Sequence, residues 1–272
     1  MTDGRPAKRG RQERQQLIVD HVVAQGEASA AELSALTGVS LMTVHRDIAE
    51  LAERGILRRY HGGVSAHPST VFESSSDFRL HANRADKEAL GRAALQFVHP
   101  GMSVMLDDST TALHLARLLP GVGPLTVVSN YRLVMEELRG AEGIRMIGVG
   151  GEYSRTHDSF VGLPAEEMIA RFSVDLAVQS TSAMDADMTY HQEQELVAVK
   201  RAIRAVAAVN VLLMDASKVG RAALHRMAPV SGFDHVLLTG PVDAELVAGM
   251  REHTDVQVIA VDGPAQDPQS ER

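Results

Sequence analysis

The sequence predicts an α/β protein with a small N-terminal winged helix-turn-helix domain, followed by a larger α/β domain with a parallel-rich sheet. Two observations lead to this prediction. Two short helical segments separated by a glycine turn lie within residues 11–66, which is the pattern of a helix-turn-helix. Over residues 87–263, strand-like apolar runs alternate with helical patterns, as in a sheet covered by helices. Residues 67–86 lack sustained periodicity, so we expect a linker there.

The N-terminal domain opens with two predicted helices. The first is amphipathic and ends near Gly26, since glycine commonly terminates helices. The second starts at Ser29, because a serine followed three residues later by Glu32 forms a capping box. It breaks at Gly38, where glycine can adopt the positive φ of a tight turn. The second helix and the glycine turn after it match the first half of a helix-turn-helix.

A third helix and a small hairpin complete this domain. Ser40 caps the helix, which ends at Arg54-Gly55. Its inward-facing residues are Val44, Ile48, Leu51 and Ala52. Residues 56–60 then predict a strand, and residues 61–63, which are His-Gly-Gly, predict the turn of a wing.

The outward face of the third helix is the first candidate for function. It carries Leu41, Met42, Thr43, His45 and Arg46 near its N-terminus, where a recognition helix meets base edges. Leu41 and Met42 could equally be packing residues or readers of thymine methyl groups. Arg58, Arg59 and His61 would lie beside phosphates, which give affinity without sequence information.

The charge distribution favours DNA at the N-terminal end of the chain. The net charge is −8, but residues 1–66 carry nine Lys and Arg against eight Asp and Glu, and the remainder carries 18 against 27. Such asymmetry suggests a DNA-facing end on an acidic body, although the first ten residues alone could equally be a solvated tail. The chain has no cysteine and no run of eighteen apolar residues. We therefore expect a cytoplasmic protein without a membrane partner.

The C-terminal domain shows seven strand-like runs and six helical patterns between most of them. The predicted strands are 103–106, 125–129, 144–149, 176–179, 211–214, 235–238 and 256–261. The predicted helices are 87–98, 110–119, 132–138, 164–171, 194–208 and 242–252. The first strand runs into DDSTT and then into a helix, and this geometry offers N–H groups and hydroxyls to an anion.

The stretch GVSLMTVHRDIAELAERGILRRYHGGVSA resembles the winged helix-turn-helix of the DeoR family of bacterial transcriptional regulators. Members follow a pattern close to V-S-x-x-T-[IV]-R-R-D-L-x-x-L-x-x-x-G-x-[IL]-x-R-x-H-G-G-A. The matching residues are Val39, Ser40, Thr43, Val44, Arg46, Asp47, Leu51, Gly55, Leu57, Arg59, His61, Gly62 and Gly63. His45 departs from the pattern, because the family usually has the first Arg of a pair there; the change weakens one DNA contact or alters the base that is read. The resemblance implies binding of double-stranded operator DNA through Ser40, Thr43, His45, Arg46, Arg58, Arg59 and His61.

The resemblance extends from about Arg11 to Gly263. The C-terminal part is similar to the family's sensor domain, which shares its fold with ribose-5-phosphate isomerase and coenzyme-A transferases. The family's D-S-G-T-T loop appears here as DDSTT, and the added Asp108 would oppose a phosphate unless it points away. Lys218 in MDASKVG is the best candidate for a cation beside a bound phosphate. The implied effector-binding residues are Asp107, Ser109, Thr110, Thr111, Asn130, Asp185, Glu195, Lys200 and Lys218.

Each of these sites has a simpler interpretation. Ser-Thr-Thr at a strand–helix junction is more often just a helix cap. His191, Glu193 and Glu195 could be read as metal ligands, but their spacing fits no known zinc motif. We therefore expect no metal site. We also expect no cofactor and no catalytic residue.

Two functions from different classes remain to be compared. One is a transcriptional regulator, a repressor of a carbohydrate-metabolism operon controlled by a sugar phosphate or related metabolite. The other is a sugar-phosphate isomerase-like enzyme with an appended DNA-binding domain, for which Asp185, Glu195 and Lys200 are chemically capable. The glycine-rich loops of the isomerases are not reproduced in DDSTT and STSAMD, which favours the regulator. Because half-sites are normally read by paired domains, we also expect a homo-oligomer, either a dimer or a tetramer.

Overall fold

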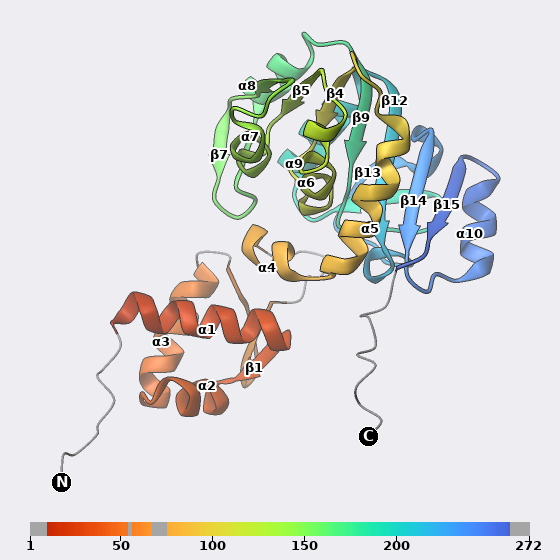
Figure 1. Cartoon of the computed structure of the whole chain (residues 1–272). Helices are drawn as coiled ribbons and strands as arrows, with labels where there is room; N and C mark the ends of the chain where they lie inside the picture. Colours follow the sequence, from red (N-terminus) through yellow and green to blue (C-terminus); the bar gives the residue numbers. More distant parts are fainter. Residues whose placement is uncertain (1–9, 54–55, 67–74, 262–272) are drawn as a thin grey trace, which may run out of the picture. The chain divides into compact units, whose positions relative to one another are not determined.

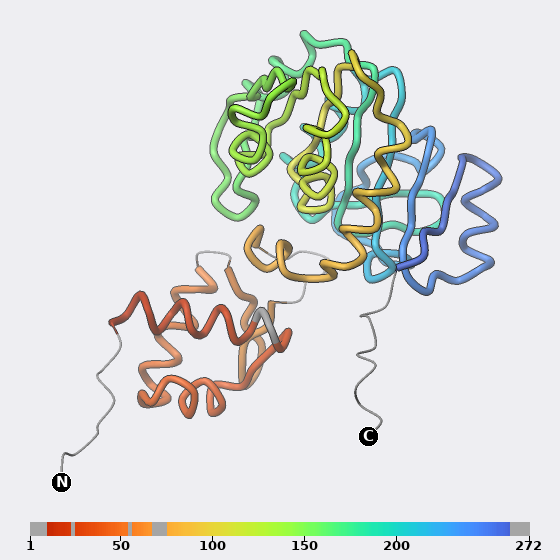
Figure 2. Tube along the Cα trace, in the orientation of Figure 1, coloured from red at the N-terminus to blue at the C-terminus, as the bar shows by residue number. Residues whose placement is uncertain are grey.

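The computed structural model describes residues 10–53, 56–66 and 75–261 (Figure 1). These residues form two compact units, which the Cα trace in Figure 2 follows from end to end. The N-terminal unit holds residues 10–66 and 75–82, and the C-terminal unit holds residues 83–261. Within these ranges no helix is both long and apolar enough to cross a membrane.

The N-terminal unit is a helix-turn-helix with a small antiparallel sheet, which confirms the predicted fold. Its elements are α1 (Arg11–Gln25), β1 (Glu27–Ser29), α2 (Ala30–Thr37), α3 (Leu41–Glu53), β2 (Arg58–Tyr60), β3 (Gly63–Ser65) and α4 (Ser76–His81). The core joins apolar residues of all three large helices, among them Ile18, Leu33, Ile48 and Leu51. The predicted end of the third helix, Arg54-Gly55, lies outside the described residues.

Local capping sets the ends of α2 as the sequence predicts. The backbone N–H of Glu32 donates to Ser29 Oγ over 3.2 Å, and the N–H of Ser29 donates to Glu32 Oε2 over 2.7 Å. Gly38 closes the helix in the left-handed conformation, with φ of 70°, which glycine adopts without strain.

The wing is a three-stranded sheet in the order β1-β3-β2. The sequence predicts its β2 strand and His-Gly-Gly turn but not β1, because a three-residue strand leaves too little alternation to recognise. A Cβ on Gly63 would lie 2.4 Å from the carbonyl oxygen of Ala28. The close approach of β1 to β3 therefore requires glycine at this position.

The C-terminal unit is built on a seven-stranded parallel sheet in the order β15-β14-β12-β9-β4-β5-β6. The strands are β4 (Ser103–Leu106), β5 (Leu125–Ser129), β6 (Ile144–Gly148), β9 (Val174–Gln179), β12 (Ala207–Asp215), β14 (His235–Thr239) and β15 (Asp255–Ile259). These are the seven strands that the sequence predicts, and the parallel-rich α/β fold is confirmed.

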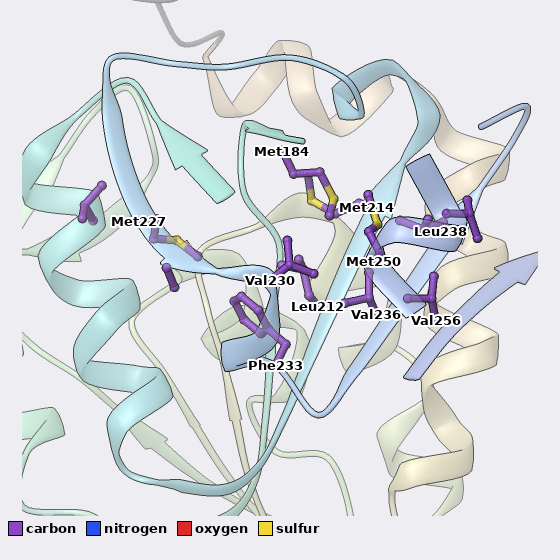
Figure 3. Close-up of a cluster of buried hydrophobic side chains, with 13 residues drawn as sticks. Met184, Leu212, Met214, Met227, Val230, Phe233, Val236, Leu238, Met250 and Val256 are labelled. Carbon is purple, nitrogen blue, oxygen red and sulfur yellow. The ribbon is translucent and has the colours of Figure 1, made fainter. Parts of the chain in front are cut away.

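Helices cover both faces of this sheet. They are α5 (Arg84–Ala94), α6 (Thr110–Ala116), α7 (Arg132–Leu138), α8 (Leu163–Ile169), α9 (Gln194–Ala205) and α10 (Ala244–Arg251). On one face, Met105 and Ala177 pack against Ile169 of α8 and Leu196 of α9. Figure 3 shows a neighbouring cluster, in which strand residues such as Leu212 and Val236 gather with Met250 of α10. Helices α5 and α6 pack on each other and contact β12, while α6 also contacts β4 and β9. None of their residues belongs to the two clusters formed with α8, α9 and α10, so they cover the other side of the sheet.

Several short elements are additions to the predicted set. They are a hairpin of β7 (Glu152–Ser154) and β8 (Ser159–Val161), and an antiparallel sheet of β10 (Ala183–Met184), β11 (Met188–His191) and β13 (His225–Pro229). Helix α4 and the start of α5 lie in the segment 67–86, for which the sequence predicts a linker. Strands β7, β8 and β10 have two or three residues and carry too little periodicity to be recognised in the sequence, and β11 and β13 lack the apolar runs that mark the strands of the large sheet.

Candidate functional site

The helix α3 buries one stripe of its surface and exposes another. Val44, Ile48 and Leu51 are buried in the core of the N-terminal unit, whereas His45 and Arg46 are exposed. This division follows from the helical period of 3.6 residues. Of the side chains that the sequence predicts on the face toward base edges, His45 and Arg46 therefore lie on the surface.

The first turn of α3 is fixed by two hydroxyl groups. The backbone N–H of Thr43 donates to Ser40 Oγ over 3.4 Å, and the hydroxyl oxygens of these residues lie 3.0 Å apart. Ser40 is exposed and Thr43 is half-buried. Both residues therefore hold the N-terminus of the helix in place, at the end where base contacts are expected.

A small pocket lies between α3 and the wing. It is lined by His45, Ile48, Arg59, Tyr60, His61, Gly62 and Gly63. The fold thus brings together three of the predicted DNA-binding residues, namely His45, Arg59 and His61. Arg58 differs from its neighbour Arg59, because it is half-buried and its Nε atom is buried.

Asp47 holds α3 against α1, a role that the motif alone does not reveal. Its carboxylate is 1% exposed and accepts hydrogen bonds from Arg14 Nε over 2.6 Å and Arg14 Nη2 over 3.0 Å. Gln15 Nε2 adds a third bond, over 3.3 Å. The hydrogen bonds to Asp47 raise the pKa of Arg14. A signal was present in the sequence, because Asp47 lies on the inward stripe with Val44 and Ile48, and a buried carboxylate needs a partner.

In the C-terminal unit, the DDSTT loop follows β4 at the carboxyl end of the sheet. Asp107 Oδ1 accepts from the backbone N–H of Ser109 over 3.1 Å, and Asp107 Oδ2 accepts from that of Ser180 over 3.0 Å. Ser109 Oγ accepts from the N–H of Ala112 over 3.1 Å, so Ser109 is the N-cap of α6. The simpler interpretation of the serine as a helix cap is therefore correct, whatever else the loop binds.

Lys200 lies between the two aspartates of this loop. Its Nζ donates to Asp107 Oδ2 over 2.5 Å and to Asp108 Oδ1 over 2.9 Å. All three side chains are at most 3% exposed. Burial alone would lower the pKa of Lys200, but attraction from the two carboxylates raises it above the ordinary value. We call these three residues the carboxylate clamp; it joins α9 to the end of β4.

The clamp continues into a network along the carboxyl ends of the strands. Ser159, on the β7–β8 hairpin, donates its hydroxyl to Asp108 Oδ2 over 3.0 Å. The neighbouring Phe160 accepts at its carbonyl from Asn130 Nδ2 over 3.0 Å. Both oxygens of Asp108 are therefore engaged by protein groups, and its charge faces Lys200.

Lys218 lies at the other end of this network. Its Nζ donates to Ser180 Oγ over 3.2 Å and is 3.7 Å from Asp215 Oδ2. Burial would raise the pKa of Asp215, but Lys218 and the hydrogen bond from Ser217 lower it. Because the side chain of Lys218 is 21% exposed, its ammonium can still reach a ligand.

The remaining predicted effector residues have different surroundings. Thr110 and Thr111 are buried in the first turn of α6, and within the described part of the chain Thr111 Oγ1 and Asn130 Oδ1 have no hydrogen-bond partner. Glu195 is exposed in the first turn of α9. Asp185 accepts from the backbone N–H groups of Asp187 and Met188 and from the hydroxyl of Tyr190.

The chemistry of this site suits recognition by charge and hydrogen bonds. Burial would raise the pKa of Asp185, but the hydrogen bonds from Tyr190 and from two backbone N–H groups lower it. The carboxylates of the clamp are held by Lys200. Across residues 10–53, 56–66 and 75–261, no three His, Cys, Asp or Glu residues are grouped so as to hold a metal ion.

Comparison with known proteins identifies both units. The model of the DeoR-like helix-turn-helix domain matches residues 14–70, and that of the DeoR C terminal sensor domain matches residues 82–239. The glycerol-3-phosphate regulon repressor of Escherichia coli K12 is 30% identical over 87% of this chain and 94% of its own length. The L-fucose operon activator of Haemophilus influenzae is 29% identical over 90% of this chain and 99% of its own length. The solved ribose 5-phosphate isomerase A of Methanocaldococcus jannaschii, at 15% identity and a TM-score of 0.38, covers 51% of this chain and 55% of its own.

Proposed function

The chain belongs to the DeoR family of transcriptional regulators, and from this premise we propose that it is a repressor of a carbohydrate-metabolism operon. The observation that carries this function is the exposed N-terminal half of α3, capped by Ser40 and placed beside the wing, in a domain that matches the family model. Such a protein acts in the cytoplasm, where its operator lies. Selection from a random DNA library with the full chain tests the proposal, since a regulator enriches one sequence and a protein of another class does not.

We propose that the C-terminal unit binds a sugar phosphate or related metabolite at the carboxyl ends of its strands, where open α/β sheets bind ligands. Within the clamp, Lys200 already pairs with Asp107 and Asp108. Lys218 is therefore the cation that we assign to the phosphate. The Oγ1 atom of Thr111 and the Oδ1 atom of Asn130 are buried and have no partner among the described residues, and we assign them to the sugar hydroxyls. A thermal-shift screen tests this proposal, because a ligand at one hundred times its Kd adds about 2.7 kcal/mol to stability.

The same unit senses its ligand without converting it. Isomerisation requires a base close to a substrate carbon. Of the three chemically capable residues, Lys200 pairs with Asp107 and Asp108, Asp185 accepts three hydrogen bonds, and Glu195 is exposed in the first turn of α9. Incubation of the full chain with ribose 5-phosphate should leave the substrate unchanged. Formation of ribulose 5-phosphate in proportion to protein concentration would favour the isomerase instead.

The exposed Arg46 is expected to contact a guanine edge. Arg46→Ala should lower operator affinity by about 1–3 kcal/mol, the value of one good bidentate base contact. Mobility-shift titrations with the selected operator measure the loss. Arg171→Ala removes an exposed arginine of the C-terminal unit and should leave the affinity unchanged. Equal operator affinity of the wild type and a folded Arg46→Ala variant would remove Arg46 from the interface.

Lys218→Ala should produce a regulator that no longer responds to its effector. Effector affinity should fall by about 1.5–3 kcal/mol, the range for hydrogen bonds to charged groups, while operator binding without effector is retained, because linkage acts only through the effector. Calorimetry measures the first effect and a mobility shift the second. Arg221→Ala, which removes an exposed neighbouring cation that donates to the Ser217 carbonyl, is the matched control. If an effector bound the Lys218→Ala variant as tightly as it binds the wild type, Lys218 would not belong to the site.

A homo-oligomer, a dimer or a tetramer, is the form that we propose binds DNA. One wing domain of this size supplies few phosphate contacts, and paired domains normally read paired half-sites. Light scattering at micromolar concentration should give a mass of two or four times 29.3 kDa. Monomers alone, both with and without operator, would contradict the proposed assembly.

A further inference from the structure

Two apolar side chains on the first turn of α3 have no place in the core of the N-terminal unit. Leu41 is 50% exposed and Met42 is 75% exposed, the highest value among the exposed large hydrophobic residues of the described chain. One and two turns further along the same helix, Val44 and Ile48 are buried. Packing of α3 in the core of the N-terminal unit therefore does not account for the apolar side chains of Leu41 and Met42.

The structure fixes the position of these side chains. The hydrogen bonds between Ser40 and Thr43 enclose residues 41 and 42 within the capped first turn. Asp47 anchors the helix to Arg14 on its opposite side. A side chain that is presented by a rigid turn loses little conformational entropy when it contacts a partner.

The surroundings of the two residues favour DNA as that partner. Residues three and four positions apart share one face of a helix, so Met42 shares a face with His45 and Arg46. None of these positions holds an acidic residue. Donors for base edges and an apolar side chain thus lie together, and this combination suits the major groove, where thymine presents a methyl group beside hydrogen-bonding atoms.

We propose that Leu41 and Met42 are specificity-determining residues that contact the C5-methyl groups of thymines in each half-site. This inference rests on the proposed function, because it assigns a base to side chains of the DNA-reading helix. Contact with a methyl group carries sequence information, since cytosine, guanine and adenine lack that group in the major groove. Replacement of thymine by deoxyuridine removes the methyl group and leaves the base pair intact, so it isolates this contact.

The test uses the full chain and the DNA site that it selects from a random library. Each thymine of the selected site is replaced in turn by deoxyuridine, and affinities are measured by fluorescence anisotropy at one salt concentration. At one or two thymines per half-site, the wild type should lose about three- to fivefold in affinity, which corresponds to about 0.8 kcal/mol for one buried methyl group. At those positions, Leu41→Ala or Met42→Ala should bind the thymine and uracil duplexes equally.

Leu224→Ala, which truncates a side chain 60% exposed in the C-terminal unit, is the matched control and should retain the full sensitivity to uracil. A wild type that binds the selected site specifically, but equally well with uracil at every position, would overturn the inference while the proposed function stands. Undiminished sensitivity of both α3 variants would overturn it as well. Failure of the wild type to enrich any sequence would instead refute the DNA-binding function itself, and the inference with it.

Discussion

Replacement of Lys200 by methionine is expected to lower the free energy of unfolding of the C-terminal unit by about 3–5 kcal/mol. The methylene chain keeps most of its volume, but the two carboxylates that Lys200 holds are left uncompensated at 2% exposure or less. Removal of one partner from a buried ion cluster typically costs this much, because the remaining charge stays desolvated. Urea denaturation followed by near-ultraviolet circular dichroism measures the change.

A second substitution separates charge from packing. In Lys200→Met/Asp108→Ser, one of the two uncompensated carboxylates is gone, so the double variant should be more stable than Lys200→Met alone. Asp108→Ser by itself should cost less than Lys200→Met, since Lys200 still pairs with Asp107. If the free energy of unfolding of Lys200→Met lay within about 1 kcal/mol of the wild-type value, the clamp would be less important to the fold than its burial indicates.

The clamp also shows where prediction from sequence stops. The seven strands of the sheet follow from apolar runs and from glycine, proline and polar residues between them, because those signals are local. The family resemblance assigns both Asp107 and Lys200 to effector binding, and their separation by 93 residues hides the fact that they bind each other. A contact over that distance depends on strand order in the sheet, which periodicity does not encode.

The same limit applies to Asp108. Its extra charge raises the question of whether this chain can accept a phosphate near the DDSTT loop. In the structure both oxygens of Asp108 are engaged, one by Lys200 and the other by Ser159. The carboxylate of Asp108 is thereby directed toward protein donors, which partly neutralise its charge.

In the N-terminal unit, local signals were sufficient for the helices and their caps but not for Asp47. The motif places Asp47 beside Arg46, which gives no information on whether it faces DNA or the core. The structure places it in the core with Arg14, 33 residues earlier. Its position on the same helical stripe as Val44 was the available indication.

Arg14→Met is therefore expected to destabilise the N-terminal unit by about 3 kcal/mol, since it leaves the buried carboxylate of Asp47 with Gln15 as its remaining side-chain donor. Hydrogen exchange of the α1, α2 and α3 amides measures the loss for this unit alone. Operator affinity should fall with it, because Arg14 and Asp47 hold α3 in its reading position.

The matched control is Arg11→Met, one turn earlier on the same helix. Arg11 pairs with Glu50 but is 62% exposed, and an exposed ion pair of this kind contributes less than about 1 kcal/mol. The same substitution on the same helix should thus have clearly different consequences at the two positions. If Arg14→Met and Arg11→Met gave equal exchange rates and equal operator affinities, Asp47 would not be the anchor of α3, and the orientation of the reading helix would have to come from apolar packing alone.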